Sequence, residues 1–440
     1  MYPKHLEETF LRKTPKSREA YERAKSIIPS ASPGGLGLVH YPYQVFIDHG
    51  EGCYMWDLDR NRYLDLVNGD WLMPLGHGNP QVKAAIAAQL EKGTTFAAPP
   101  GDLGYELASL IQQRMPSVEM IRFATSGTEA NQNAMRVART FTGRGKIAKL
   151  SGAYHGTADQ LVIRNGLNTD PRYEPPGLMP GTREDVVLLP PNDAEACEKI
   201  IEREKDHLAA VLFESIMGVC GFLCSSHEFV RRIRAITEKY GILLIFDEVV
   251  TMPLDTGGAQ GYYKVKPDLT TFGKAIGGGL PLAAYGGRRD VMGLLDPHQH
   301  ELNPPLAIAA TMGGMAICLA AGIAAIKQLT PQAHRHLHAL GDHMRDGIAK
   351  IARKHNVPLQ ATGIGHFTGI HWTPTKVVDY PSFTTSDRRI IDKICFSLAT
   401  QGFLAFAMGF FVLSTPMTTA DIDQFLAALE QALKDNDLIG

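Results

Sequence analysis

The chain has 440 residues, of which 44 are Lys or Arg and 46 are Asp or Glu, giving a formal net charge of −2 at pH 7. A near-neutral chain without a basic block argues against a nucleic-acid partner or an anionic membrane, because both attract clustered positive charge. With 44% hydrophobic and 20% charged residues, the composition also excludes a disordered chain. Six scattered cysteines and a first segment too charged for a secretory signal favour a cytoplasmic protein with free thiols.

The predicted elements begin with a charged amphipathic stretch at 16–28, which is typical of a surface helix. Short apolar runs then alternate with helical patterns. They are 120–124 before 129–141, 209–213 before 227–240, and 243–246, later followed by 268–272. Continuous apolar runs of this kind are typical of strands buried on both faces of a sheet. The alternation predicts an α/β domain with a mostly parallel sheet.

The segment 306–326 carries no charged residue and is long enough to cross a bilayer. It is mostly Ala, Gly and Thr, and Gly313 and Gly314 interrupt it, so we expect a buried loop followed by a buried helix from about Met315. Beyond it, a surface helix at 331–355, a strand at 410–413 and a helix from about Thr418 predict a smaller α+β domain. The expected domains are a large one at 61–325 and a small one at 326–440, with residues 1–60 packing with the small domain.

Three polar segments follow predicted strands, and in open α/β sheets ligands bind beyond the carboxyl ends of the strands. In the first segment, Ser126 and Glu129 have capping-box spacing, and Gly127 lets backbone amides face outward at a helix start. This arrangement is typical of a phosphate site, although an ordinary well-capped helix has the same pattern.

The other two segments contain one unusual charge each. Asp247 ends a buried apolar strand, where a carboxylate is costly unless it meets a cation such as a protonated ring nitrogen. A structural salt bridge is the alternative. Lys274 lies among small apolar residues, with Gly277, Gly278 and Gly279 allowing close backbone approach. Such surroundings favour a neutral amine that attacks a carbonyl, and a solvent-exposed lysine is the alternative.

A phosphate cup, a ring-nitrogen carboxylate and an imine-forming lysine are together the parts that a pyridoxal phosphate enzyme needs. The sequence resembles the class III aminotransferases of the fold-type-I pyridoxal phosphate superfamily, from about Ile27 to the C-terminus, through the motifs SGTEAN, GAYHG, FDEV and TFGKAIGGG. Within that family it is similar to the group of glutamate-1-semialdehyde aminomutases and β-amino-acid aminotransferases. The resemblance implies an α/β fold, pyridoxal 5'-phosphate as cofactor, and small-molecule amine and keto substrates.

The resemblance also implies roles for individual residues. Lys274 would hold the cofactor as a Schiff base and shuttle a proton, and Asp247 would keep the ring nitrogen protonated. Thr311 matches a threonine that reaches the phosphate of a neighbouring subunit, which implies a homodimer with shared active sites. The other residues implied at the cofactor are Ser126, Gly127 and Thr128 at the phosphate, Tyr154 on one ring face, His155 beside it, and Glu214.

The sequence departs from the family where the substrate carboxylate is expected. Relatives acting on β-amino acids carry an arginine just before the C-terminal apolar strand and usually another in an N-terminal loop, and arginine pairs with a carboxylate through two hydrogen bonds. Here Met408 takes the first place, and 30–44 contains no Arg or Lys. We therefore expect an apolar substrate pocket lined by Trp71, Tyr41, Tyr43 and Met408. Arg164 is the alternative carboxylate anchor, and the expected substrate is a hydrophobic amine or amino ketone.

The predicted function is a ping-pong aminotransferase that exchanges an amino group between an amine donor and a keto acid or ketone. An aminomutase of the glutamate-1-semialdehyde type and a non-catalytic pyridoxal phosphate-binding protein are the alternatives. A nicotinamide dehydrogenase is disfavoured, because 363–369 has no glycine at the third fingerprint position. The histidines at 334, 336, 338 and 343 lack a carboxylate or cysteine partner set, so they predict a solvated helix face and no metal site.

Overall fold

A computed structural model describes residues 2–34, 42–167, 175–301 and 304–440. Contacts divide the chain into two compact units, each described here by itself. Unit 1 contains Met1–Asn79, Arg335–Val377 and Pro381–Gly440, and unit 2 contains Pro80–His334 with Val378–Tyr380. The main divisions lie somewhat further along the chain than the expected residues 60 and 325.

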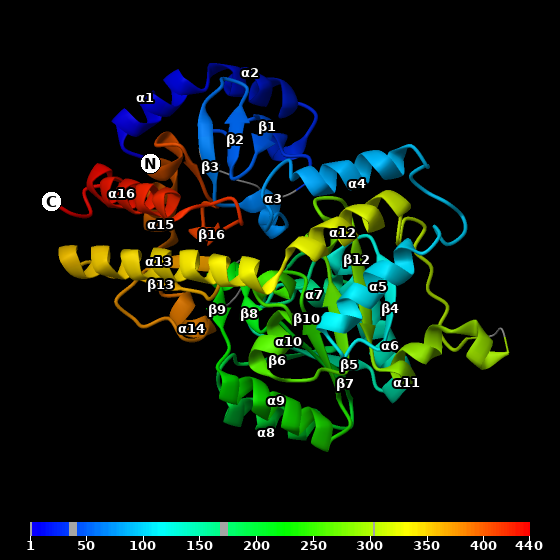
Figure 1. Cartoon of the computed structure of the whole chain (residues 1–440). Coiled ribbons are helices and arrows are strands. Elements are labelled where there is room, and N and C mark those ends of the chain that lie inside the picture. The colour runs from blue at the N-terminus through cyan, green and yellow to red at the C-terminus, as the bar shows by residue number, and fades with distance from the viewer. Residues whose placement is uncertain (1, 35–41, 168–174, 302–303) are drawn as a thin grey trace. The chain divides into compact units, whose positions relative to one another are not determined.

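Unit 2 is built on a seven-stranded sheet of order β4-β12-β11-β10-β7-β5-β6 (Figure 1). All its pairings are parallel except those of β12, which runs antiparallel to β4 and β11. The strands are β4 (Met120–Ala124), β5 (Lys146–Leu150), β6 (Val186–Leu189), β7 (Leu208–Phe213), β10 (Leu243–Asp247), β11 (Leu269–Phe272) and β12 (Ala283–Gly287), and β8 (Ile216–Met217) pairs with β9 (Leu223–Cys224) beside the sheet. The predicted mostly parallel α/β sheet is therefore confirmed.

Helices pack against this sheet because their apolar stripes match its buried strands. On α6, Ala130, Ala134 and Val137 are fully buried in one cluster with Ile147 of β5 and Ile245 of β10. The helices of unit 2 are α4 (Pro80–Leu90), α5 (Leu103–Arg114), α6 (Gly127–Thr142), α7 (Asp159–Val162), α8 (Ala194–Glu204), α9 (His227–Lys239), α10 (Gly258–Tyr263), α11 (Arg289–Met292) and α12 (Ala316–Gln328).

The uncharged segment is partly as expected. It ends in α12, which is buried on most of its surface and packs on α4 and α5. The loop before α12 is not buried within this chain, because Ala307, Ala309, Thr311 and Met312 are all exposed. No helix among the described residues is both long and apolar enough to cross a membrane.

Unit 1 joins both ends of the chain. Its four-stranded sheet has the order β1-β2-β3-β15, and β15 pairs in parallel with β3, with Phe403 beside Leu64. An antiparallel sheet of order β13-β14-β16 completes the unit. The strands are β1 (Ile47–Glu51), β2 (Tyr54–Asp57), β3 (Arg62–Asp65), β13 (Leu359–Thr362), β14 (Phe367–Trp372), β15 (Phe403–Leu404) and β16 (Phe410–Val412).

The helices of unit 1 form one core with these strands. Leu340 of α13, Ile394 of α15 and Phe425 of α16 are buried in a single cluster that also contains Leu64 and Phe411. The helices are α1 (Lys4–Lys13), α2 (Pro15–Ala24), α3 (Asn68–Trp71), α15 (Arg388–Thr400) and α16 (Thr419–Asp435), while α13 (Pro331–His355) and α14 (Tyr380–Phe383) begin in unit 2 and continue into unit 1.

Candidate active site

The predicted cofactor residues gather at one edge of the seven-stranded sheet. Strands β4, β5, β7, β10 and β11 all point the same way, because β12 lies antiparallel between β4 and β11. Their carboxyl ends therefore meet at a single edge. The residues at or just after these ends are Ser126 after β4, Tyr154 and His155 after β5, Glu214 after β7, Asp247 at the end of β10, and Lys274 after β11.

The start of α6 has the properties of an anion site. Ser126 Oγ accepts a hydrogen bond from the Glu129 N–H at 3.2 Å, as predicted. The Glu129 carboxylate turns instead to the N–H and hydroxyl of Thr125, at 2.9 and 2.6 Å, so the predicted reciprocal half of the capping box is wrong. Among the described residues, the N–H groups of Gly127 and Thr128 have no hydrogen-bond acceptor. Two free amides at the positive end of a helix dipole are suited to a phosphate.

Lys274 follows a backbone that approaches this helix start closely. A methyl group built on Gly273 would lie 3.2 Å from Val249 Cγ1 and 3.8 Å from Gly127 Cα. One built on Gly127 would lie 3.0 Å from both Val249 methyl carbons. Lys274 itself has a φ of 49°, in the left-handed region that costs energy for a residue with a side chain. Glycines at 127 and 273 thus let the lysine turn and the phosphate cup sit side by side around Val249.

Asp247 is buried in a network of hydrogen bonds. Its Oδ2 accepts from His155 Nδ1 at 2.7 Å and from Asn131 Nδ2 at 2.8 Å. Its Oδ1 accepts from the Val249 N–H at 3.0 Å. The Thr271 hydroxyl donates its proton to Asn131 Oδ1 at 2.7 Å, a shorter contact than its 3.4 Å to Asp247 Oδ1. An ionised carboxylate has about four acceptor positions, so Oδ1 keeps one for a further donor.

The His155 side chain is hydrogen-bonded to the Asp247 carboxylate. Burial lowers the pKa of His155, and the hydrogen bond to Asp247 opposes that shift. Its Nε2 is buried and has no hydrogen-bond partner among the described residues. A neutral imidazole that donates through Nδ1 is consistent with both observations, because the undonated Nε2 then carries no proton.

Glu214 is fully buried and holds two backbone amides. Its Oε2 accepts from the Tyr154 N–H at 2.9 Å and its Oε1 from the Gly218 N–H at 3.0 Å. Burial raises the pKa of Glu214 to about 8, and the nearby Asp247 charge acts in the same direction. Glu214 therefore fixes the backbone that carries Tyr154 and His155. This role is exerted through the backbone and does not require contact with a ligand.

These residues fit pyridoxal phosphate by the chemistry of their donors and acceptors. The free amides of Gly127 and Thr128 suit its phosphate, and the remaining Oδ1 position of Asp247 suits a protonated ring nitrogen. Lys274 supplies the amine for its carbonyl carbon.

The substrate residues expected from sequence are not gathered in the same way. Tyr41 lies outside the described residues. Tyr43 is buried between Phe10 and Tyr21, and its hydroxyl is 2.9 Å from Thr14 Oγ1, so its side chain belongs to the interior of unit 1. This placement argues against the expected role of Tyr43 in a substrate pocket.

Two other expected residues of unit 1 lie close to an arginine or to aromatic rings. Trp71 packs edge to face on Phe406, with ring centroids 5.5 Å apart. Met408 Sδ is 3.7 Å from Arg388 Nη1, and the Arg388 guanidinium also lies over the Phe383 ring at 5.1 Å. The surroundings of Met408 are therefore not uncharged, contrary to the expectation.

In unit 2, the described hydrogen-bond partners of Asp247 do not include Arg164 or Thr311. Arg164 has a φ of 46°, and its carbonyl accepts from the Gly152 N–H at 2.8 Å in the loop after β5. Thr311 is exposed at the start of the turn before α12.

Sequence reasoning missed three residues that build the site. Asn131 ties α6 to Asp247 and to the carbonyl of His155, Thr271 fixes the amide of Asn131, and Val249 fills the space between two glycines. Asn131 was visible as the last letter of SGTEAN and as a polar residue beside the buried Ala130 and Ala134. Arg388 was missed as well, and no local pattern marks it.

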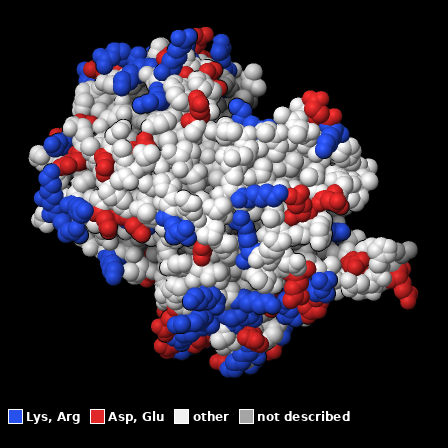
Figure 2. All heavy atoms as spheres, in the orientation of Figure 1, with Lys and Arg blue, Asp and Glu red and all other residues white. Residues whose placement is uncertain are grey.

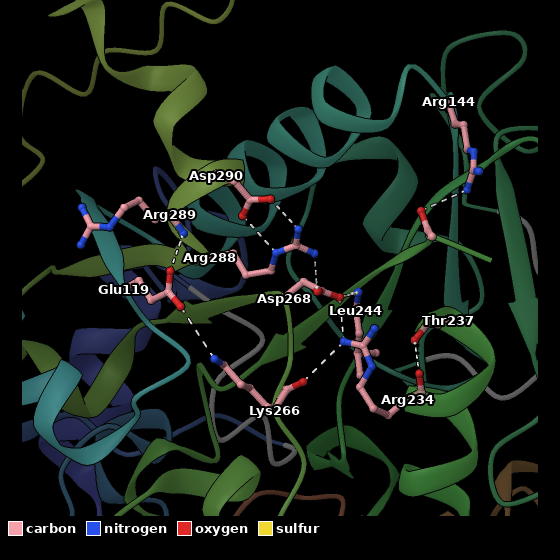
Figure 3. Close-up of polar contacts among 11 residues, drawn as sticks. Glu119, Arg144, Arg234, Thr237, Leu244, Lys266, Asp268, Arg288, Arg289 and Asp290 are labelled. Carbon is pink, nitrogen blue, oxygen red and sulfur yellow. Dashed lines mark hydrogen bonds and ion pairs between the residues drawn. The ribbon is translucent and has the colours of Figure 1, made fainter. Parts of the chain in front are cut away.

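A cavity of about 740 Å³ lies at the opposite edge of the sheet and is lined by many charged groups (Figure 3). Asp268 accepts from Arg234 at 2.7 Å and from Arg288 at 2.9 Å, and Lys266 lies 3.7 Å from Glu119. Figure 2 likewise shows Lys and Arg mixed with carboxylates over α8 and α9. Because these charges already face one another, the cavity is better explained as a structural ion-pair network than as the active site.

The histidines of the 334–343 stretch differ from the expected solvated face. His334 is buried, and His336 Nε2 is 3.0 Å from the Met417 carbonyl. His343 Nε2 pairs with Asp423 at 2.6 Å. Across the described ranges, no group of three or more His, Cys, Asp or Glu residues has a metal-binding arrangement.

Comparisons with known proteins identify the family of the chain. The family model for class-III aminotransferases matches residues 39–433. A glutamate-1-semialdehyde 2,1-aminomutase of Bacillus pumilus is 36% identical over 430 residues, which is 95% of this chain and 98% of the relative.

Two solved structures share the fold over nearly the whole chain. An omega-transaminase from Sphaerobacter thermophilus is 33% identical with a TM-score of 0.90, covering 96% of this chain and 98% of its own. A beta-phenylalanine aminotransferase from Variovorax paradoxus is also 33% identical with a TM-score of 0.90, covering 98% and 97%. The fold-type-I architecture expected from the resemblance is thereby confirmed.

Proposed function

Because the chain belongs to the class-III aminotransferases, which are pyridoxal phosphate enzymes acting on small molecules, we propose that it exchanges an amino group between an amine donor and a keto acid or ketone. The observation that carries the proposal is the convergence of Lys274, Asp247 and the start of α6 at one sheet edge. That convergence supports a working catalytic site over the alternative of a non-catalytic cofactor-binding protein.

Each residue has a distinct task in this proposal. When bound, pyridoxal phosphate supplies an electrophilic carbonyl carbon and an electron-withdrawing ring. Asp247 Oδ1 would hold a proton on the ring nitrogen, and the amides of Gly127 and Thr128 would bind the phosphate. Lys274 Nζ would accept the proton that leaves the substrate carbon and return it to the product. His155 and Asn131 would keep the Asp247 carboxylate correctly oriented through their hydrogen bonds.

For the donor we propose a hydrophobic amine or a β-amino-acid-like compound. Met408 replaces the arginine of the resemblance, which favours an apolar substituent. Arg388 places a positive charge beside Met408 Sδ, at 3.7 Å, and is a candidate for a carboxylate anchor in addition to Arg164. A donor with an apolar group and a β-carboxylate would contact Met408 through the apolar group and pair with Arg388 through the carboxylate. The pairing matters because a buried carboxylate needs a charged or hydrogen-bonding partner.

An aminomutase is a second candidate function, favoured by the 36% identity to the Bacillus pumilus aminomutase. The two functions differ in whether the intermediate leaves the site. Mixing the holoenzyme with a donor and no acceptor tests this directly. Release of one ketone per active site, with its nitrogen left on the cofactor, supports the transaminase, whereas isomerisation of glutamate-1-semialdehyde to the amino ketone of the same composition, over many turnovers and without an added acceptor, supports the aminomutase.

We further propose that the enzyme works as a homodimer. The loop carrying Thr311 is exposed although it is apolar, and Met312 is 58% exposed. Gly314 packs beside the Phe123 ring, as does Gly104, whose neighbour Tyr105 is 77% exposed. Exposed apolar groups gathered in this way are typical of a surface that another chain covers. A second copy would place each Thr311 near the other copy's phosphate cup, as the resemblance implies.

A further inference from the structure

The loop that carries Thr311 lies against β4, which is an edge strand of the seven-stranded sheet. Edge strands leave backbone groups unpaired and are commonly covered by a neighbouring segment. Arg122 on β4 donates through its Nη1 to the Ile308 carbonyl at 2.9 Å. The side chains of Leu306 and Ile308 also pack on the core beside the sheet. These contacts fasten the first half of the loop.

The second half of the loop approaches β4 closely through its backbone. A methyl group built on Gly313 would lie 2.7 Å from the Phe123 carbonyl oxygen and 2.8 Å from Ala310 Cβ. Both distances are shorter than van der Waals contact, so a side chain at 313 would push the loop away from the strand. The Gly313 N–H donates to the Ala310 carbonyl at 3.0 Å, which closes a turn with Thr311 and Met312 at its tip.

This turn is held at both ends while its tip is exposed. Thr311 and Met312 are exposed in the single chain, and Arg122 and Gly313 tie the residues on either side of them to β4. A tip that is already fixed in place loses less conformational entropy when another molecule binds it. Arg122 is also exposed, and a second copy over this loop would shield its hydrogen bond from water, where such a bond is stronger.

We propose that Arg122 and Gly313 are positioning residues, which hold this turn so that Thr311 reaches the phosphate cup of a second copy of the chain. The inference rests on the proposed homodimer and on the proposed role of the cup. Because the turn serves the other copy, loss of either anchor weakens cofactor binding in the partner's site. The site of the altered chain itself stays intact as long as the other copy supplies an unaltered turn.

The first test measures cofactor affinity in homodimers of Arg122→Met and of Gly313→Val. The first variant removes the donor to the loop, and the second adds atoms where even a methyl group collides with β4. Holoenzyme is diluted, and the bound fraction is followed by the absorbance of the lysine-bound cofactor. Each variant is expected to bind the cofactor about 10-fold more weakly, the low end of the range for supporting contacts around a site.

Two matched controls accompany these variants. Gly145→Val is the control for the glycine, because a methyl group built on Gly145 meets no atom within 4 Å. Arg231→Met is the control for the arginine, because Arg231 is exposed on α9, away from the loop. Both controls are expected to keep the parental affinity for the cofactor.

The decisive test uses mixed dimers, which are isolated through a different affinity tag on each subunit. One subunit carries Arg122→Met with Gly313→Val, and the other carries Lys274→Ala, so the lysine-bound cofactor forms only in the subunit with the altered turn. That subunit receives an unaltered turn from the other, so the inference predicts the parental affinity in the mixed dimer. A purely structural effect of the two changes would damage their own subunit. The mixed dimer would then lose its cofactor as readily as the homodimer that carries both changes, and this outcome overturns the inference.

The remaining outcomes are also distinguishable. Unchanged cofactor affinity in both single-variant homodimers overturns the inference, and so does a parent enzyme that is monomeric. Where the subunit with both changes folds poorly, Arg122→Met alone replaces it in the mixed dimer and the same comparison holds. Because the readout is cofactor absorbance, failure of the proposed amino-group exchange is recognised separately, by a parent holoenzyme that keeps its cofactor and releases no ketone from any donor.

Discussion

Asn131 donates its side-chain amide to Asp247 across 2.8 Å, joining the helix of the proposed phosphate cup to the strand of the proposed ring-nitrogen carboxylate. The same amide donates to the His155 carbonyl at 2.9 Å, and its oxygen accepts from Thr271 at 2.7 Å. One buried side chain therefore holds four elements of the site: α6, the loop after β5, β10 and β11. Because the nitrogen and the oxygen of the Asn131 amide both have fixed hydrogen-bond partners, we expect the site to be rigid.

Replacing Asn131 with Ala is expected to weaken cofactor binding by about 10- to 100-fold, the range seen when supporting hydrogen bonds around a site are removed. The change removes one buried hydrogen bond from each of Asp247, Thr271 and the His155 carbonyl, at a cost of about 1–3 kcal/mol. Cofactor titration followed by fluorescence and the midpoint of thermal unfolding measure the two effects. Gln112→Ala is the control, because this amide makes a 3.3 Å contact in an exposed place on α5. An unchanged cofactor affinity in the Asn131 variant contradicts the assigned role.

Replacing Lys274 with Ala is expected to lower turnover by at least about 10³-fold and to remove the absorbance of the lysine-bound cofactor, since the proposal gives both the imine and the proton transfer to this amine. Stopped-flow absorbance and single-turnover ketone release measure this. Lys266→Met serves as control, because Lys266 is exposed at the opposite sheet edge and pairs with Glu119. Turnover that survives in the Lys274 variant supports the non-catalytic alternative or another lysine.

The sequence predicted the sheet well, because buried strands such as 209–213 and 243–246 are continuous apolar runs, each followed by a carboxylate. It also placed Ser126, Asp247 and Lys274 near one another, since parallel strands bring their carboxyl ends to one edge. These predictions depend on local pattern and strand polarity, which the sequence contains.

The contacts that arise only on folding were not predictable. The partners Asn131 and Asp247 are 116 residues apart, and nothing local pairs them. A tyrosine such as Tyr43 suits either a substrate pocket or a protein core, and the sequence alone does not distinguish the two. Its packing on Phe10 places it in the core of unit 1. Arg388 lies 20 residues before Met408, and the contact forms where α15 passes the segment before β16.

Stability is expected to fall on acidification because of His371. Burial, with a smaller contribution from the Arg388 charge, lowers the pKa of His371 from 6.5 to about 4. Below pH 6.5 the unfolded chain therefore binds a proton that the folded chain does not, so stability is lost as pH falls from about 6.5 toward 4. Thermal unfolding between pH 7 and 4 measures the loss.

His371→Gln is expected to flatten this acid-side loss, because the amide can still meet Thr362, whose hydroxyl is 2.7 Å from His371 Nε2, and does not titrate. His49→Gln is the control, since His49 is exposed beside Asp48. An identical pH dependence in parent and His371 variant contradicts the assignment.

Replacing Met312 with Glu is expected to weaken the proposed dimer. A charge in an exposed apolar patch disfavours the burial of that patch by a second copy, at a cost of several kcal/mol if the charge stays unpaired. Light scattering after gel filtration gives the mass. Met179→Glu, at another exposed methionine of unit 2, is the control. A parent enzyme that is monomeric at micromolar concentration contradicts the dimer proposal outright.

Replacing Arg388 with Met tests the substrate proposal. If Arg388 binds a carboxylate, the KM of a β-carboxylated arylalkylamine rises by about 10- to 100-fold, the range expected for a charged hydrogen bond, while the KM of the parent arylalkylamine changes little. Arg389→Met is a matched control. Arg389 is the next residue in the chain, and its guanidinium is 90% exposed and pairs with Asp387 at 3.4 Å. Arg164→Met, assayed in parallel, reports on the alternative anchor.

The same Arg388 variant has a second readout that does not depend on substrate. The Arg388 charge lowers the pKa of His371, so its removal raises that pKa toward 6.5, makes the acid-side loss of stability smaller and shifts the end of that loss to higher pH. Observing this shift shows that the variant folds with His371 in its native place. If the KM rises equally for both donors and the shift is present, Arg388 shapes the pocket without binding a carboxylate. If only Arg164→Met raises the KM of the carboxylated donor, Arg164 is the carboxylate anchor.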